Sequence, residues 1–205
     1  MMPRPRWNDK NRSVGRLFLE HALLVSDVMV SLELACRKHG SVRPLTGDDI
    51  QIAESVRSPR SFRWRVKVNG RLTLGIIPDR VFVLEMKKED GGTNRAFFFL
   101  ECDRGTMPVM RKNLVQSSFY RKLLAYEATW ASGLHRSRFG VNRFRVVTVT
   151  TSVGRVESIV EACSQLKRGR GIFLFLDQAA IEEHGDILTA PWKTVRSGET
   201  ATLLP

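Results

Sequence analysis

The sequence predicts an α/β domain with a mixed sheet flanked by helices. Two kinds of pattern indicate this class: short apolar or alternating segments, which are typical of strands, and longer segments with apolar residues at helical spacing. In chain order they predict the element order α-β-β-β-α-β-α-β. Each of the last two strands follows a helix, so crossover connections should leave these two strands parallel to each other.

Length and composition favour one main domain. A chain of 205 residues with 42% hydrophobic content can bury one good core but hardly two. Residues 1–16 carry five basic residues, two prolines and almost no apolar content, which predicts a flexible basic arm. The α/β domain is then expected over residues 17–190, followed by a tail over residues 191–205 in which Trp192 packs down.

The first helix and the first strand follow from residue spacing. Apolar residues recur every three or four positions from Leu17 to about Lys38, which predicts a helix. A short helix is expected over Ile50–Val56, with residues 46–49 as its cap. Phe62–Val68 alternates apolar and basic residues, as a strand does when one face is packed and its outer face is cationic.

Turn residues then divide a predicted antiparallel meander. Asn69-Gly70 and Gly91-Gly92 mark hairpin turns, and Pro78-Asp79 separates two apolar segments between them. The strand segments after the first turn are Leu72–Ile77, Val81–Met86 and Ala96–Leu100.

The second half of the chain alternates helices and strands. Leu114–Trp130 carries its aromatic and leucine residues on one face, as in a helix packed on a sheet. A basic loop is expected from His135 to Arg143. Phe144–Thr150 is rich in β-branched residues and predicts a strand, residues 156–166 form a second helical stripe, and Ile172–Leu176 is a short buried strand.

Charge indicates the class of partner. Thirty-three Lys and Arg against 21 Asp and Glu give a net charge of +12, which favours a polyanion and, first among these, nucleic acid. The alternative is a well-solvated basic surface that binds nothing specific. No segment approaches the ~20 apolar residues of a membrane-spanning helix, and no apolar signal region follows the basic start. We therefore expect a cytoplasmic protein with no membrane association.

The three cysteines do not indicate a disulfide framework or a zinc site. They are odd in number, far apart and set within apolar patterns, which favours buried thiols in a reducing compartment. Their positions are Cys36, Cys102 and Cys163.

Three carboxylates form the one concentrated chemical feature. Side chains alternate along a strand, so Glu101 and Asp103 project from one face while Cys102 points to the other. If the hairpin turns about its glycine pair, Asp79 falls opposite Asp103 or Arg104. The three carboxylates are then expected to converge at one end of the sheet.

This concentration of negative charge predicts a metal ion. It is unfavourable without a counter-charge, and a hard divalent cation such as Mg²⁺ or Mn²⁺ suits such oxygen ligands. In phosphodiester hydrolysis the ion would activate a water, with Lys122 in the following helix assisting. In the structural alternative, Asp79 caps a turn and the two acids at the strand end pair with Arg80 and Arg104.

Several of these residues also resemble known families. The order of elements, Pro78-Asp79 and the acidic pair ending the third strand resemble the PD-(D/E)xK nuclease core, which implies a restriction-endonuclease-like fold. Over about residues 17–176 the chain resembles the bacterial replication-relaxation family, which is associated with plasmid replication control and DNA relaxation. The motifs are H-A-L-L-V-S-D-V at 21–28, P-D at 78–79, F-L-E-C-D-R-G-T at 99–106 and K-L-L-A-Y at 122–126.

The resemblance implies roles for individual residues. Asp79 and Glu101 take the place of metal ligands, and so does Asp103, although the nuclease pattern has its catalytic lysine there. Lys122 and Tyr126 resemble in spacing the Q-x-x-x-Y element of RecB-like nucleases, so a lysine displaced onto this helix would reach the same site.

Structural explanations exist for the helical residues. Tyr126 lies on the apolar face of its helix and suits the core, while Lys122, at the edge of that face, suits a snorkelling position. Related nucleases sometimes place an extra acid in the first helix, where Glu20 and His21 lie. A lone histidine there is otherwise structural.

The expected DNA contacts are basic. Family members commonly carry a winged-helix region before this core, so we expect a core-only chain or a fragment, with a homodimer or a partner supplying that region. Trp7 and Trp64 lie among arginines, which suits base stacking or, alternatively, the core. The candidate phosphate-binding residues are Arg4, Arg6, Arg12, Arg63, Arg65, Lys67, Arg136, Arg138 and Arg143.

These observations support three hypotheses. The first is a DNA-binding protein of plasmid or mobile-element replication or DNA relaxation that is a divalent-metal-dependent nuclease or nickase. Its catalytic residues would be Asp79, Glu101, Asp103 and Lys122. The second is a catalytically inactive DNA-binding regulator of replication or transfer with the same fold. The third assigns the basic surface to a protein or RNA partner.

Overall fold

A seven-stranded mixed sheet forms the centre of the molecule. The computed structural model describes residues 7–50, 62–68, 72–88 and 91–204, with side chains described from residue 15 onward. The strands of the main sheet, in spatial order, are β1 (Val42–Thr46), β4 (Arg80–Lys87), β5 (Thr93–Asp103), β6 (Phe144–Thr150), β7 (Phe173–Asp177), β8 (Trp192–Lys193) and β9 (Thr200–Ala201). Strands β2 (Trp64–Val68) and β3 (Leu72–Ile76) form a separate two-stranded sheet.

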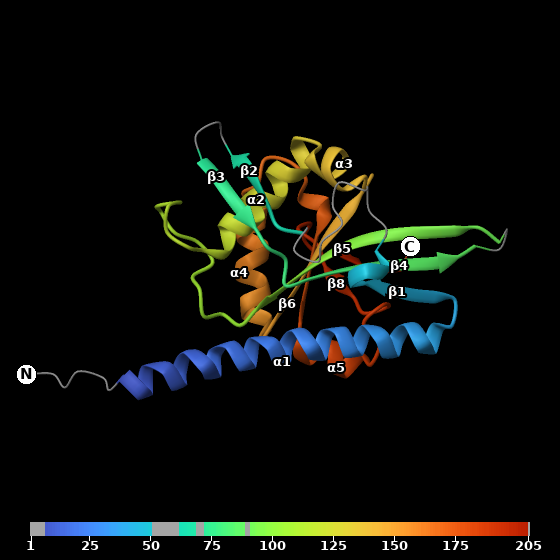
Figure 1. Cartoon of the computed structure of the whole chain (residues 1–205), viewed down its shortest axis with the longest axis horizontal. Coiled ribbons are helices and arrows are strands. Elements are labelled where there is room, and N and C mark those ends of the chain that lie inside the picture. Colours follow the sequence, from blue (N-terminus) through green and yellow to red (C-terminus); the bar gives the residue numbers. More distant parts are fainter. Residues whose placement is uncertain (1–6, 51–61, 69–71, 89–90, 205) are drawn as a thin grey trace, which may run out of the picture.

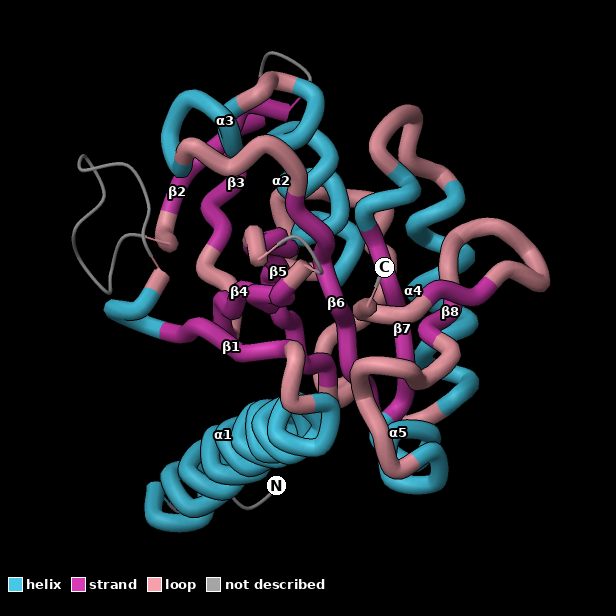
Figure 2. The backbone as a smooth tube through the Cα atoms, turned by 90° about the vertical axis from the view of Figure 1, so that its right-hand side faces the viewer, coloured by secondary structure: helices cyan, strands magenta, loops and turns pink. Residues whose placement is uncertain are grey.

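Helices cover both faces of the main sheet (Figures 1 and 2). They are α1 (Trp7–His39), α2 (Phe119–Ala131), α3 (Leu134–Phe139), α4 (Val153–Ser164) and α5 (Gln178–His184), and short 3₁₀ turns span Gly47–Asp49 and Arg170–Ile172. One buried cluster joins the sheet to α2, α4 and the β2–β3 hairpin. A second cluster on the opposite face joins it to α1, α5 and the C-terminal segment. The α/β class with a mixed sheet is confirmed.

Helix α1 begins ten residues earlier than the sequence indicated. It starts at Trp7, so the prediction of a flexible arm over residues 1–16 is wrong for residues 7–16, and residues 1–6 lie outside the described part. α1 contains no proline, and Arg and Lys are good helix formers. Because the segment after Leu17 is anchored by its packing, extending the helix needs no new nucleus.

The segment after α1 forms a strand that the sequence did not indicate. β1 pairs antiparallel with β4, and it contains Pro44, which is tolerated because β1 lies at the edge of the sheet. The predicted helix over Ile50–Val56 does not begin at Ile50, which is extended. Its remaining residues lie outside the described part of the chain.

The predicted meander is wrong at one junction. β3 pairs with β2, whereas β4 pairs with β1 and β5, so the chain leaves one sheet at Pro78 and enters the other. The hairpin turns its apolar side, including Trp64 and Leu74, toward α2 instead of extending the main sheet. With the outer edge of β4 occupied by β1, no edge remains there for β3.

The register of β4 and β5 also differs from the prediction. Arg80 pairs with Leu100 and Lys87 with Thr93, so paired residue numbers sum to 180 instead of 182 or 183. The Lys88 amide donates to the Gly92 carbonyl at 2.8 Å and closes the turn. The centre of the turn therefore lies before Gly91-Gly92 and not between these two glycines. Asp79 therefore lies at the level of Glu101, not of Asp103.

The second half of the chain largely follows the prediction. β5, β6 and β7 are parallel, as expected for the last two strands. Helix α3 replaces much of the basic loop predicted from His135 to Arg143, because Gly133 and Gly140, with φ of 70° and 65°, delimit one short helix. Trp192 is fully buried, and residues 191–204 extend the main sheet through β8 and β9 instead of forming a tail.

Two expectations drawn from composition can be compared with the structure. The three cysteines are free and buried, as predicted. In the described part of the chain, no helix is both long enough and apolar enough to cross a membrane.

Candidate functional site

The candidate site lies where the parallel strands of the main sheet end. Along the face of β5 that is covered by α2, Phe99 is followed by Glu101 and Asp103. On β6, Thr148 and Thr150 lie in register with these two acids. The apolar core thus changes to polar side chains at the carboxyl ends of the strands, the edge at which α/β sheets commonly bind ligands.

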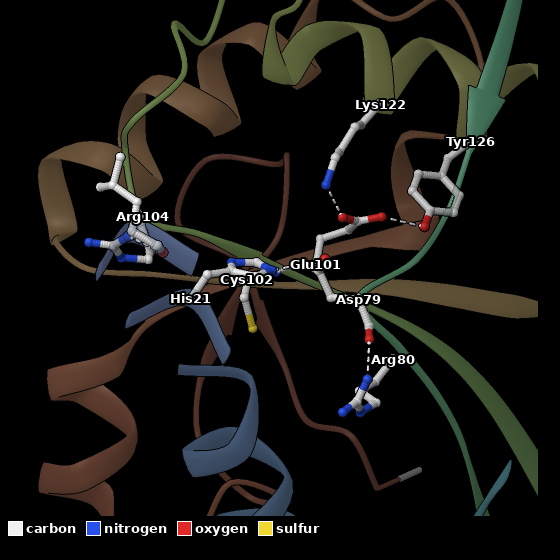
Figure 3. Close-up of polar contacts among 9 residues, drawn as sticks. His21, Asp79, Arg80, Glu101, Cys102, Arg104, Lys122 and Tyr126 are labelled. Carbon is white, nitrogen blue, oxygen red and sulfur yellow. Dashed lines mark hydrogen bonds and ion pairs between the residues drawn. The ribbon is translucent and has the colours of Figure 1, made fainter. Parts of the chain in front are cut away.

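Glu101 is the centre of this site. Its side chain is only 1% exposed, and α2 supplies both of its partners. Lys122 Nζ contacts Glu101 Oε2, and the Tyr126 hydroxyl donates to Glu101 Oε1 at 2.6 Å (Figure 3). Because Lys122 and Tyr126 are four residues apart, they project from the same side of the helix and reach both oxygens of one carboxylate.

Burial dominates the electrostatics of Glu101. Loss of solvent raises the pKa of Glu101 to about 7, against the opposing effect of Lys122 and with a further increase from Asp79. Burial lowers the pKa of Lys122, but the nearby carboxylates outweigh it and leave that pKa raised. Burial and the Glu101 carboxylate hold the pKa of Tyr126 well above its usual value. The lysine therefore stays charged near neutral pH, where the carboxyl titrates.

Asp79 is fixed by both the sheet and α1. Its backbone amide donates to the Leu100 carbonyl at 3.0 Å, which places the residue at the start of β4 beside the end of β5. Its Oδ2 accepts from the Cys102 amide at 2.7 Å, and its Oδ1 lies 3.2 Å from His21 Nε2 (Figure 3). Both carboxylate oxygens are therefore engaged.

Asp103 belongs to a separate ion pair. Its Oδ2 accepts from Arg155 Nε on α4 at 2.5 Å, and the same guanidinium donates to the Met107 carbonyl. Arg104 pairs with Glu20 of α1. The alternative in which Arg80 and Arg104 pair with Glu101 and Asp103 is therefore wrong. Among the described residues, neither arginine forms an ion pair with these two acids.

The predicted three-carboxylate metal site does not fit this arrangement. Among the residues that the structure describes, no group of three or more His, Cys, Asp and Glu is arranged to hold a metal ion. Glu101 is bound by a lysine and a tyrosine, Asp79 by a backbone amide and a histidine, and Asp103 by an arginine. The structure thus joins Glu101 to Lys122 as expected but directs Asp103 toward α4.

Three contacts at this site were not anticipated from the sequence. His21 and Glu20 received little weight, yet they join α1 to Asp79 and to Arg104. For His21, the available signal was its place at the start of the H-A-L-L-V-S-D-V motif, which Glu20 directly precedes. Arg155 had no such signal, because its contact with Asp103 spans 52 positions of the chain.

The predicted DNA-contacting residues fall into two groups. A cationic cluster of exposed residues lies on β2, on α3 and just beside them, and α3 lies beside β2 (Figure 2). The two elements pack together through the rings of Phe139 and Trp64. Trp64 itself is 2% exposed, so it is a core residue and no base-stacking platform. Arg4 and Arg6 lie outside the described residues, and the side chain of Arg12, like that of Trp7, is not described. The cationic cluster consists of Arg63, Arg65, Lys67, Arg136, Arg138 and Arg143.

Comparison with known proteins identifies one family. The model of the replication-relaxation family matches residues 1–143, which is well over half of the chain. Neither a search of curated proteins nor a search of solved structures found a match. The matched segment contains His21, Asp79, Glu101, Lys122 and Tyr126, whereas Arg155, the partner of Asp103, lies outside it. The chain belongs to the replication-relaxation family.

Proposed function

We propose that this protein is a DNA-binding protein that acts in the replication or relaxation of plasmid or mobile-element DNA, with the cationic cluster as its phosphate-binding surface. Family membership supports the role in replication or relaxation. The net charge of +12 favours a polyanionic partner.

One observation carries the assignment of the surface. Within the described residues, no member of the cationic cluster forms an ion pair with a carboxylate, whereas many other basic side chains do. Arg65 and Lys67 project from the outer side of β2, and their partners across the hairpin are Gly75 and Thr73. The Arg138 guanidinium donates to the Arg63 carbonyl at 3.2 Å, which ties α3 to the hairpin. Guanidinium groups on fixed elements that have no carboxylate partner in the described part of the chain suit phosphate oxygens.

The contacts of Asp79, Glu101 and Asp103 favour a protein that binds DNA without cleaving it. Each of its three carboxylates is satisfied by groups of the protein itself, and Glu101 is almost fully buried. In this proposal the Glu101–Lys122–Tyr126 network connects α2 to the sheet, and Asp79 connects α1 to it. The three carboxylates then stabilise the domain that presents the cationic cluster.

Salt-dependent DNA binding tests the proposal. The logarithm of affinity for duplex DNA should fall with the logarithm of salt concentration, with a slope of about −0.9 per contacted phosphate. The double variant Arg65→Gln, Lys67→Gln should make that slope shallower by about 2 if each residue contacts one phosphate.

A control variant with the same loss of charge is available. Arg37 and Arg196 are exposed but pair with Glu33 and Glu199, so Arg37→Gln, Arg196→Gln should leave the slope nearly unchanged. Absent binding, salt-insensitive binding, or equal effects of the two double variants would contradict the proposed surface.

A second candidate function is metal-dependent DNA cleavage, as the resemblance to the PD-(D/E)xK core implies. The observation that favours it is the position of Lys122, which contacts Glu101 next to Asp79. For this function the contacts of Lys122 and Tyr126 with Glu101 have to open, because they occupy both oxygens of the carboxylate.

Conversion of supercoiled plasmid to nicked or linear DNA decides between the two candidates. The assay compares the wild type, Asp79→Asn and Glu101→Gln in Mg²⁺ and in Mn²⁺, with Glu85→Gln as a control carboxylate that pairs with Arg43 and Arg95 outside the site. Cleavage that both site variants abolish and the control retains would establish the nuclease. Absent cleavage together with salt-dependent binding would support the binding protein.

A further inference from the structure

Helix α1 carries apolar residues on two opposite sides. One side packs on the main sheet through residues that include Leu24, Val28 and Leu32, each less than 5% exposed. The other side is exposed and includes an apolar stripe whose members are each more than half exposed. The stripe consists of Leu19 (58%), Leu23 (52%), Val30 (57%) and Leu34 (59%).

The stripe is narrow and straight. Its members are separated by four, seven and four residues, which at 3.6 residues per turn are close to whole numbers of turns. The stripe therefore runs along a single side of the helix, roughly opposite the side that packs on the sheet. Figure 1 shows α1 lying along the outside of the domain, so this side faces away from the sheet.

The stripe has the same spacing when it is read in either direction. Leu19 and Leu34, like Leu23 and Val30, are equally distant from the midpoint between residues 26 and 27. The flanking ion pairs obey the same symmetry: Arg16 binds Glu20 at 2.8 Å, and Arg37 binds Glu33 at 3.1 Å. A surface with this symmetry matches a copy of itself rotated by 180°, which is the requirement for a twofold interface.

We propose that the stripe is a homodimer interface in which the α1 helices of two copies pack antiparallel across a twofold axis near residues 26 and 27. Leu19 then lies at the level of Leu34 of the partner subunit, and Leu23 at the level of Val30 of the partner subunit. The proposal does not depend on DNA binding.

Charge favours a second copy over a nucleic acid as the occupant of the stripe. The four members of the stripe are uncharged, exposed Ser26 and Asp27 border its midpoint, and the arginines that flank it are already paired with glutamates of the same helix. An apolar partner of matching spacing is what such a side can accommodate. Each copy carries a net charge of +12, so added salt should screen the repulsion and strengthen self-association, whereas it weakens DNA binding.

The size of the stripe predicts a weak dimer. Fifteen residues separate Leu19 from Leu34, which is about 22 Å of helix at 1.5 Å per residue. A contact of this length falls in the small class of interfaces, below about 1,200 Å² in total. Self-association should therefore appear only at micromolar or higher protein concentration.

Sedimentation equilibrium of the full chain across a concentration series tests the interface. The wild type should dimerise, and Leu23→Gln, Val30→Gln should weaken dimerisation by about 10-fold or more, because two apolar contacts are lost from each copy. Phe18→Gln is the matched control, since Phe18 is 74% exposed on α1 but lies outside the stripe. Circular dichroism would verify that the variants fold.

Disulfide cross-linking tests the orientation. The double variant Leu19→Cys, Leu34→Cys should form cross-linked dimers under mild oxidation, whereas each single variant should not. The native cysteines are buried, and the two new positions are too far apart on one helix to react within a copy. A wild type that stays monomeric, a dimer that the glutamine variant leaves intact, or efficient cross-linking of a single variant would overturn the proposal.

Discussion

Replacing Glu101 with glutamine isolates the effect of burying its charge. Burial raises the pKa of Glu101 from its ordinary value of 4.5 to about 7, against the opposing effect of Lys122. The folded protein then binds this proton more tightly than the unfolded chain does. The carboxyl therefore contributes stability that is fully present below pH 4.5 and is lost as the pH rises through about 7.

The magnitude follows from the same pKa change. One tenfold change in proton affinity is worth about 1.4 kcal/mol, so a change from 4.5 to about 7 corresponds to about 3 kcal/mol of folding free energy. Glutamine resembles the protonated acid in shape and charge. The stability of Glu101→Gln relative to the wild type should therefore increase by up to about 3 kcal/mol between acid and mildly alkaline pH.

Urea unfolding of both proteins between about pH 4 and about pH 9 measures this difference. Glu85→Gln is the control, because hydrogen bonds from Arg95 and Arg43 lower the pKa of Glu85. That lowered pKa gives stability that is present above the ordinary pKa and lost only below it. The Glu85→Gln difference should therefore stay nearly constant above about pH 6 and change in the opposite direction only toward about pH 4. The difference in unfolding free energy between Glu101→Gln and the wild type could instead be independent of pH, or could favour the wild type more as the pH rises. Either result would refute the conclusion that burial outweighs Lys122 in setting the pKa of Glu101.

Three further predictions concern the same face of the sheet and the buried thiols. Arg155→Ala leaves the buried Asp103 carboxylate without its partner and should cost about 3 kcal/mol in urea unfolding near neutral pH, whereas Arg196→Ala, at an exposed ion pair, should cost less than about 1 kcal/mol. Equal losses would contradict the structural role of the buried pair. Tyr126→Phe removes a hydrogen-bond donor to Glu101 and should lower the free energy of unfolding by about 1–3 kcal/mol, with the larger loss at high pH, where Glu101 is charged. A melting temperature that is unchanged at low and at high pH would count against this hydrogen bond. Burial raises the pKa of each thiol, so a thiol reagent should react only after unfolding, and rapid labelling of the native protein would contradict the buried positions of Cys36, Cys102 and Cys163.

Local pattern was sufficient for most elements and insufficient for their pairing. Period-two alternation identified the strand around Trp64, but the choice of its sheet depended on which edges were free after β1 had paired with β4. β1 itself was not recognised, because five residues with a central proline give little periodic signal. The register of the hairpin depended on where its turn closed, which residue spacing alone does not determine.

The sequence by itself determined the α/β class, the parallel strands and the buried cysteines, and the resemblance to the Q-x-x-x-Y element brought Lys122 to the site of Glu101. The class and the buried positions follow from apolar alternation along strands and apolar spacing along helices, which are local rules. Only the tertiary structure decided the side-chain partners of Asp79 and Asp103 and the bond from Tyr126 to Glu101. Asp103 meets Arg155 across 52 positions, and Asp79 meets His21 across 58, because separate elements pack at one end of the sheet. That packing determines which basic side chain lies beside which carboxylate, because ion pairs form only between side chains that the completed fold brings within a few ångströms.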